Sequence, residues 1–362
     1  MSGDRLTVVS ADTHAGADVQ GYRAYLTADL HDEFDRWAAG FSTPWLDADD
    51  PDVVLNWESD RRLAVLEADG IAAEVVFPNT YPPFFPSQSL AGTLPASDDE
   101  YRRRWAGLRA HNRWLVDFCA AVPGRRRGVI QVLPNDIDDA VAEIRWASRQ
   151  ADLCGVLLPS VPPNTLEPLY TARYDPLWAA CVDAGLPVVT HAGGGAPTLP
   201  DEHPATMPIL VYEYGFWSHR TVWHLVFGGV FDRFPDLRFV ITEQGGCKWL
   251  GGLGTALDQK YETLVDPAKQ TVRLDAGGVS GLRRRPSEYL ADNCWLGASF
   301  LQPHDAPHRH DVCVEHVMWG ADFPHLEGTT PFSREALRAT LAAVPVDEIR
   351  SIVGGAAVAL YG

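Results

Sequence analysis

Eight short apolar runs are the feature that most constrains how this chain can fold. They recur along the whole sequence, at residues 6–11, 73–77, 128–133, 155–158, 187–190, 237–242, 293–297 and 316–321. Most of them are continuous rather than alternating, which is typical of parallel strands buried on both faces. We therefore expect eight parallel strands.

Helical patterns with recognisable ends separate these runs. Asp136 can cap a helix over residues 137–147, and Ser59 can cap one over residues 60–69 that stops at Gly70. Strands that alternate with helices over 362 residues predict a (β/α)8 TIM barrel in the α/β class, formed by residues 1–362 as a single domain. A doubly wound open sheet is the alternative. Further helices are expected at residues 101–121, 175–184, 216–233, 248–264, 333–343 and 347–360.

Two long connections, residues 15–57 and 77–97, interrupt this alternation. Long loops within a compact domain usually carry function or cover a site. We interpret both as loop insertions that cover the active site on the C-terminal face of the barrel.

Composition excludes several classes of partner and of site. The formal net charge is −18, from 30 basic and 48 acidic residues, so nucleic acid and anionic membranes are not expected partners. The six cysteines are far apart and form no Cys-x-x-Cys pair, which argues against a thiolate zinc site or a disulfide framework. No run reaches membrane-spanning length and no signal-peptide core begins the chain, so a cytoplasmic location is predicted.

Chemically reactive side chains gather where the predicted strands end. Asp12 and His14 follow the first strand, His191 the fifth, Glu243 the sixth and Asp322 the eighth. In a (β/α)8 barrel these positions meet at the C-terminal face, and alternate positions of a strand, such as Asp12 and His14, point the same way. Imidazole and carboxylate ligands suit a divalent metal, with zinc the first choice and manganese or iron the alternatives.

Each of these residues also has an ordinary structural explanation when taken alone. His191 can be a strand-end histidine bonded to a loop, and Asp322 can cap the helix that follows it. Only their common placement at strand ends makes the set persuasive. We therefore predict Asp12, His14, His191 and Asp322 as metal ligands.

Three motifs around these residues resemble a known family. They are Ser-Ala-Asp-Thr-His-Ala-Gly at 10–16, Val-Val-Thr-His-Ala-Gly-Gly at 188–194, and Trp-Gly-Ala-Asp-Phe-Pro-His-Leu-Glu-Gly at 319–328. They look like the strand-1, strand-5 and strand-8 signatures of the amidohydrolase superfamily, and most resemble its amidohydrolase-2 group, which includes aminocarboxymuconate-semialdehyde decarboxylases. The resemblance implies a barrel with one divalent metal, often zinc, that activates water or orients a carboxylated substrate.

One departure from the family pattern affects the expected chemistry. Where the decarboxylases place an acid/base histidine before paired glycines, this chain has Gln244, which cannot carry a proton. Glu243 can take over that role or ligate the metal, or His219 or His224 can reach the site from the preceding segment.

The resulting hypothesis is a metal-dependent hydrolase or non-oxidative decarboxylase that acts on a small, cyclic or aromatic, carboxylated compound. Asp322 or Glu243 is the expected base for hydrolysis, and His325, His219 or Glu243 the expected acid for decarboxylation. A barrel that has lost catalysis and serves as a binding or scaffold protein is the alternative, and a nucleotide-dependent enzyme is disfavoured because no phosphate-binding glycine loop is present. The resemblance also suggests a homodimer.

Two further sets of side chains are candidates for substrate contact. Arg61 or Arg62 is a candidate to bind a substrate carboxylate, although solvation at the surface is the preferred interpretation for both. A set of aromatic side chains can line the pocket, although about half of them are expected only to pack loops against the barrel. They are Trp45, Trp57, Tyr81, Phe84, Phe85, Trp217 and Phe300.

Overall fold

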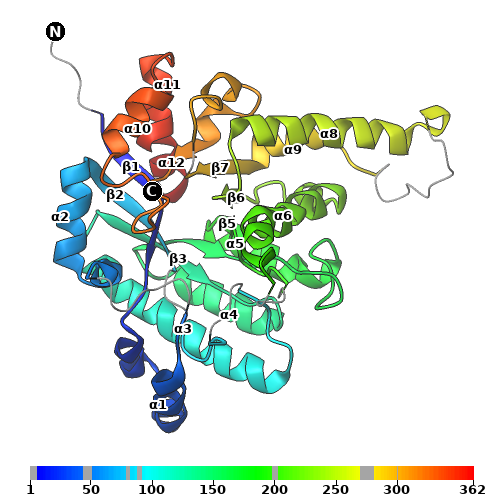
Figure 1. The fold of residues 1–362 in the computed structure, drawn as a ribbon. Coiled ribbons are helices and arrows are strands. Elements are labelled where there is room, and N and C mark those ends of the chain that lie inside the picture. Colours follow the sequence, from blue (N-terminus) through cyan, green and yellow to red (C-terminus); the bar gives the residue numbers. More distant parts are fainter. Residues whose placement is uncertain are drawn as a thin grey trace.

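Eight parallel strands form one continuous sheet in the order β1 to β8, with helices between successive strands (Figure 1). The structure is a computed structural model that describes residues 6–43, 51–78, 82–87, 92–197, 203–269, 281–299 and 301–362. The (β/α)8 barrel predicted from the sequence is confirmed. The strands are β1 Val8–Ala15, β2 Ile71–Pro78, β3 Arg126–Gln131, β4 Leu153–Leu157, β5 Val188–His191, β6 Phe239–Thr242, β7 Cys294–Ala298 and β8 Val317–Trp319.

The sheet closes between β1 and the segment that follows β8. The backbone amide of His14 donates to the carbonyl of Phe323 (2.6 Å), and the amide of Asp322 donates to the carbonyl of Asp12 (3.0 Å). Thr13 and Phe323 form an isolated parallel bridge at the same place. The seam of the barrel therefore runs directly between residues predicted as metal ligands.

One of the two helix caps predicted from the sequence is present. Asp136 accepts the amide of Asp139 (3.0 Å) as predicted, but Ser59 is the first residue of its helix and its hydroxyl accepts a bond from Arg126 (2.7 Å) instead of capping. The α-helices are α1 His31–Gly40, α2 Ser59–Asp69, α3 Asp98–Ala120, α4 Ile137–Ala147, α5 Asp175–Ala184, α6 Thr206–Phe227, α7 Val230–Arg233, α8 Cys247–Val265, α9 Pro286–Asn293, α10 Ser333–Thr340, α11 Val346–Arg350 and α12 Ala356–Tyr361.

Shorter helical turns complete the connections. One of them, η8, is a π-helical turn that joins α11 to α12, so the single helix predicted at 347–360 contains one irregular turn. The 3-10 turns are η1 Val19–Tyr25, η2 Ala28–Leu30, η3 Val53–Asn56, η4 Ala172–Tyr174, η5 Pro267–Lys269, η6 Ala306–His308 and η7 Val314–His316, and η8 is Ser351–Gly355.

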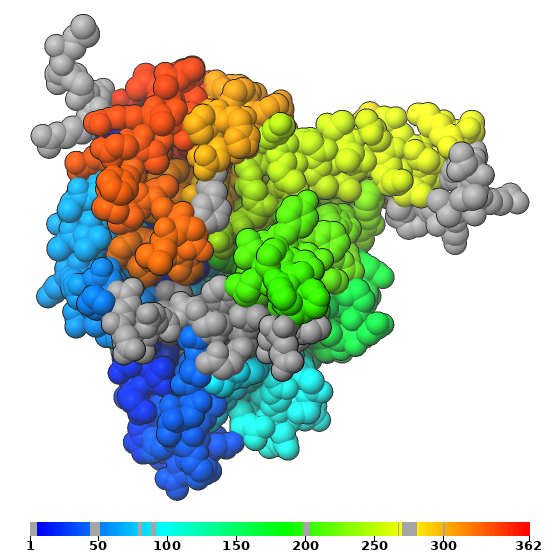
Figure 2. All heavy atoms as spheres, in the orientation of Figure 1, coloured from blue at the N-terminus to red at the C-terminus, as the bar shows by residue number. Residues whose placement is uncertain are grey.

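The inside of the barrel is a packed apolar layer. Inward side chains from seven strands, among them Val75, Val129, Val189 and Met318, form one buried cluster, and the C-terminal helix α12 packs against it. The larger apolar cluster lies between the strands and the surrounding helices. Helix α8 stands out from this body as an arm (Figures 1 and 2). Among the described residues, no helix combines the length and apolar character needed to cross a membrane.

Both long connections contain ordered elements in their described parts. The first carries η1, η2, α1 and η3, so it is largely helical rather than an open loop. In the second, Gly92 forms a parallel bridge with Gly194, and its carbonyl accepts the amide of Gly195 (2.9 Å). This second connection therefore runs beside the loop that follows His191. That the two connections cover the active site stays a prediction.

Candidate metal centre at the barrel mouth

A β-bulge in β1 determines which way Asp12 and His14 point. Residues Ser10 and Thr13 pair with positions two apart on β2, although they are three apart on β1, so β1 carries one extra residue there. Before the bulge, the odd-numbered side chains of β1 face the apolar barrel interior. After it, Asp12 and His14 turn inward and Thr13 turns outward to β2.

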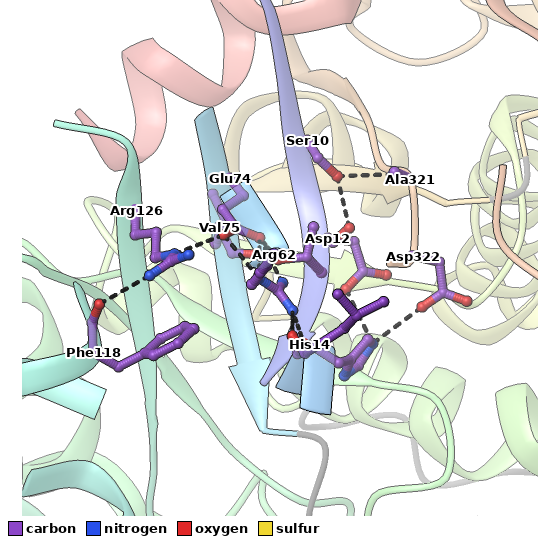
Figure 3. Close-up of polar contacts among 12 residues, drawn as sticks. Ser10, Asp12, His14, Arg62, Glu74, Val75, Phe118, Arg126, Ala321 and Asp322 are labelled. Carbon is purple, nitrogen blue, oxygen red and sulfur yellow. Dashed lines mark hydrogen bonds and ion pairs between the residues drawn. The ribbon is translucent and has the colours of Figure 1, made fainter. Parts of the chain in front are cut away.

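Four predicted ligands meet at this point. Nε2 of His14 lies 3.4 Å from Oδ1 of Asp12 and 3.1 Å from Oδ1 of Asp322 (Figure 3). Nε2 of His191 lies 3.6 Å from Oδ1 of Asp12. Asp12, His14 and His191 offer ligand atoms that all lie within 4.8 Å of one another, and His14 and Asp322 belong to a second such group. Two imidazoles and two carboxylates are a donor set that fits Zn²⁺, Mn²⁺ or Fe²⁺.

Each of the four side chains also presents one buried atom without a hydrogen-bond partner in the described structure. These atoms are Oδ1 of Asp12, Nε2 of His14, Nε2 of His191 and Oδ2 of Asp322. Leaving a buried polar atom unpaired costs about 1–3 kcal/mol. A bound cation at this centre would satisfy all four, so the residues present fit a divalent metal.

The other atoms of these side chains are held in place. Nδ1 of His14 donates to the carbonyl of Pro78 (3.0 Å), and Nδ1 of His191 donates to the carbonyl of Ala192 (3.0 Å). The Ser299 hydroxyl donates to Oδ2 of Asp12. Because carbonyls hold both Nδ1 atoms, both imidazoles present Nε2 lone pairs to the centre, which is the usual arrangement of metal-binding histidines.

Asp322 and Glu243 have an unusual backbone conformation. Both have φ of 56°, in the left-handed region, which aspartate adopts more readily than glutamate. Each lies just past a strand, and the amide of Glu243 donates to the carbonyl of Gly297 on β7 (3.0 Å). The carboxylates of the two residues come close together, with ligand atoms within 4.8 Å of one another. The sequence carries no signal for this conformation.

Glu243 lies close to both His191 and Asp322, and it offers a ligand atom within 4.8 Å of one of Asp322. Its Oε2 is 3.2 Å from Nδ1 of His191. Burial lowers the pKa of His191, but attraction to Glu243 and Asp12 raises it above its usual value. Burial raises the pKa of Glu243. His191 lowers this pKa and Asp322 raises it, and the result lies above the usual value. The carboxylates around His191 thus favour its cationic form, as expected of a site that attracts a cation.

His325 lies beside Asp322 and His14. Its Nδ1 is 2.9 Å from Oδ1 of Asp322, and its ring stacks on His14 with centroids 4.1 Å apart. Burial lowers its pKa, but Asp322 and Glu243 raise it above the usual value. The side chain is about one-quarter exposed (26%), whereas that of His14 is buried. His325 is therefore the histidine of the centre that a substrate in the mouth reaches most easily.

His219 and Gln244 contact each other rather than the four ligands. Nε2 of His219 binds the backbone carbonyl of Gln244, and its ring stacks on Trp249 with centroids 3.8 Å apart. The Gln244 side chain donates to the hydroxyl of Thr190 on β5 (3.1 Å). His224 packs against Tyr170, and burial lowers its pKa to about 4.

Both interpretations of Arg62, solvation at the surface and binding of a substrate carboxylate, are wrong. The guanidinium is fully buried (0% exposed) behind β1, where it pairs with Glu74, so it is neither solvated nor able to bind a substrate carboxylate. Charge alone could not reveal this, because the partner is on β2. Arg61 is at the surface, as expected, and pairs with Asp52 (2.5 Å).

The predicted aromatic wall is only partly described. Phe84 is buried against Phe34, with ring centroids 6.3 Å apart, and Phe85 lies under Arg104. Trp57 packs against the core, and Trp217 lies beside Phe216 on α6. Phe84 and Phe85 therefore serve packing. Trp45, Tyr81 and Phe300 fall outside the described residues.

Comparisons with known proteins agree with this architecture. A family model for amidohydrolases of the amidohydrolase-2 group matches residues 11–362. A comparison with curated proteins finds no match.

Solved structures share the fold over essentially the whole chain. The 5-carboxyvanillate decarboxylase of Sphingomonas paucimobilis is 21% identical, with 99% of each chain covered and a TM-score of 0.72. That of Novosphingobium aromaticivorans, solved with manganese and 3-methoxy-4-hydroxy-5-nitrobenzoic acid, is 17% identical, with 100% of this chain and 98% of that chain covered and a TM-score of 0.71. The 2,6-dihydroxybenzoate decarboxylase of Rhizobium is 16% identical, with 99% of each chain covered and a TM-score of 0.68. At these identities the likeness establishes the shared fold.

Proposed function

Because the chain belongs to the amidohydrolase-2 family, we propose that it is a metal-dependent enzyme that decarboxylates or hydrolyses a small aromatic or cyclic carboxylated compound. The observation that carries this proposal is the set of four buried atoms without a hydrogen-bond partner in the described structure, one from each of Asp12, His14, His191 and Asp322. Decarboxylation is the first reaction to test, because the solved structures above are decarboxylases of aromatic acids.

The metal would be held by Asp12, His14, His191 and Asp322. Zinc is the proposed ion and manganese the alternative, since one of the similar structures contains manganese. When bound, such an ion supplies Lewis acidity that orients an anionic substrate oxygen or lowers the pKa of water. Ser299, by donating to Oδ2 of Asp12, keeps the other carboxylate oxygen turned to the centre.

We assign proton transfer to His325 and Glu243. His325 is partly exposed at the mouth and anchored by Asp322, and Glu243 lies beside His191. An acid must come within hydrogen-bond reach of the atom it protonates. His219 fits this role less well, because its Nε2 already binds the carbonyl of Gln244.

Metal analysis tests the first part of the proposal. Purified protein should hold one equivalent of zinc or manganese, and dialysis against EDTA should remove it together with activity. Protein that holds far less than one equivalent, and whose unfolding midpoint does not change when either metal is added, would refute the metal site.

Turnover assays test the reaction. Release of CO₂ from 2,6-dihydroxybenzoate and 5-carboxyvanillate, as probes of aromatic acids, is compared with cleavage of aromatic lactones, esters and amides. Metal-loaded protein that turns over neither group of compounds would favour the alternative of a binding or scaffold barrel. A homodimer and a cytoplasmic location stay predictions, and light scattering tests the first.

A pair of matched variants tests the proton-transfer role. His325 pairs with Asp322 three residues away, and exposed His308 pairs with Asp311 in the same spacing (2.6 Å). H325Q should lower kcat by about 100-fold or more, the usual contribution of an acid/base group, while H308Q leaves it unchanged. Equal kcat values for H325Q and wild type at full metal occupancy would overturn the assignment.

A further inference from the structure

A buried cation lies directly behind the proposed metal ligands. The guanidinium of Arg62, on α2, donates from Nη1 to the backbone carbonyl of His14 (2.7 Å) and to that of Leu55 (3.1 Å). From Nε it donates to Glu74 on β2 (3.0 Å). In Figure 3, Arg126, Glu74 and Arg62 form a row that ends at His14.

We propose that Arg62 is a positioning residue of the metal centre, which sets the separation between the ligands of β1 and the ligand that follows β8. This inference rests on the proposed metal site. Arg62 binds the carbonyl of His14 on one side of the barrel seam, and its guanidinium lies over the ring of Phe323 on the other, 4.8 Å from the ring centroid. Phe323 directly follows Asp322.

The backbone at the seam transmits this contact to the ligands. His14 and Phe323 share a hydrogen bond of 2.6 Å, and Asp322 and Asp12 share one of 3.0 Å. Ser10 adds a further link, because its hydroxyl accepts the amide of Ala321 (2.8 Å) and donates to the carbonyl of Asp12 (2.7 Å). A shift of the His14 carbonyl or of the Phe323 ring therefore changes the distance between Asp12 and Asp322.

Glu74 fixes the orientation of the guanidinium. Its carboxylate accepts Nε and Nη2 of Arg62 and also the hydroxyl of Thr13 (2.8 Å), the residue between the two β1 ligands. A planar guanidinium can bind the carboxylate, the carbonyl and the aromatic face at once, whereas a lysine ammonium is a single point charge on a flexible chain. The geometry thus requires arginine at position 62.

Arg126 provides a matched control. It is also buried (1% exposed) and donates to the same Glu74 carboxylate from Nε (2.8 Å). Its other contacts are Ser59 and the carbonyl of Phe118, on the far side of the cluster from the seam. R62K and R126K therefore disturb the same buried cluster, but only R62K disturbs the seam.

The test measures metal affinity and metal geometry. Metal-free wild type, R62K and R126K are titrated with Mn²⁺ by calorimetry, and their Co²⁺ forms are compared by visible absorption, which reports coordination geometry. We expect R62K to bind Mn²⁺ about 10–100-fold more weakly, the usual effect of losing a partner that orients ligands, and to have a shifted Co²⁺ spectrum. R126K should retain wild-type affinity and spectrum although it is destabilised.

Equal Mn²⁺ affinities for folded R62K and R126K would overturn the positioning role. If R62K does not fold, the F323L variant is tested instead, because it removes the aromatic face that Arg62 contacts and keeps the buried charges. Weaker Mn²⁺ binding by F323L would support the positioning role, and unchanged binding would overturn it. Failure of wild type to bind Mn²⁺ or Zn²⁺ would instead refute the proposed metal site, so the two failures are distinguishable.

Discussion

Replacing Glu74 with glutamine should lower the free energy of unfolding more than the same substitution at an exposed ion pair does. The Glu74 carboxylate is buried (3% exposed) between two buried guanidinium groups, those of Arg62 and Arg126. Glutamine has nearly the same shape but carries no charge, so E74Q leaves two buried cations without a counter-ion. Removing one partner of a buried ion pair costs about 3–5 kcal/mol, and we expect E74Q to fall in the upper half of that range.

The control uses the same substitution at an exposed pair. Glu67, on the same helix as Arg62, binds Arg125 at 2.8 Å, but both side chains are solvent-accessible. E67Q should cost about 0–1 kcal/mol. Urea unfolding of the EDTA-treated proteins, followed by tryptophan fluorescence, gives both free energies of unfolding without a contribution from metal binding.

The pH dependence of the difference adds an internal check. Burial raises the pKa of Glu74, but Arg62 and Arg126 outweigh it, and the pKa in the folded protein lies below its usual value. Such a group stabilises the fold above the pKa of the unfolded state, about 4.3, and this contribution is lost as the pH falls through the folded pKa. The wild-type advantage over E74Q should therefore narrow below about pH 4. A cost below 1 kcal/mol at pH 7, similar to that of E67Q, would refute this account of the cluster.

Three further outcomes are expected. H191A should bind Mn²⁺ at least about 100-fold more weakly than wild type in calorimetry, since loss of an outer-shell partner alone costs 10–100-fold; an unchanged affinity would exclude His191 as a ligand. Zinc at 100 times its Kd should raise the free energy of unfolding of metal-free wild type by about 2.7 kcal/mol, and should do so far less for H191A. Burial lowers the pKa of His111 to about 3, so below the unfolded pKa of about 6.5 the unfolded state takes up a proton that the folded state refuses. As the pH is lowered from 6 to 4.5, the free energy of unfolding of wild type should therefore decrease more steeply than that of H111Q, by about 1.4 kcal/mol per pH unit. Equal slopes for the two proteins would contradict this.

The fold was readable from the sequence because most of the strands contain continuous apolar runs and helix signals separate most of these runs. The first strand shows the limit of that reading. Its apolar run stops at Ala11, but β1 continues through Asp12 and His14 to Ala15, because the neighbouring strand and the seam satisfy its backbone. Where polar side chains occupy the last positions of a strand at the barrel mouth, the apolar pattern in the sequence stops before the strand does.

The site was readable only in part, because its members are placed by tertiary contacts. The sequence placed Asp12, His14, His191 and Asp322 at one end of the barrel, and the structure brings them together. The left-handed conformation of Glu243 has no sequence signature, since glutamate seldom adopts it. The burial of Arg62 was equally hidden, because charged residues are mostly exposed and its partner is 12 residues away on another element.

The bulge in β1 makes the site depend on chain length as well as on side-chain chemistry. Asp12 and His14 face the barrel mouth because β1 has one more residue than β2 between the paired positions Ser10 and Thr13. Deleting Ala11 would preserve every candidate ligand, yet it would reverse the face of the strand on which two of them lie. A homologue with an intact Asp-x-His motif but a one-residue gap at this point would therefore have its motif directed at the helices. Alignments of such chains should be judged by the spacing between the apolar run and the motif before its letters are compared.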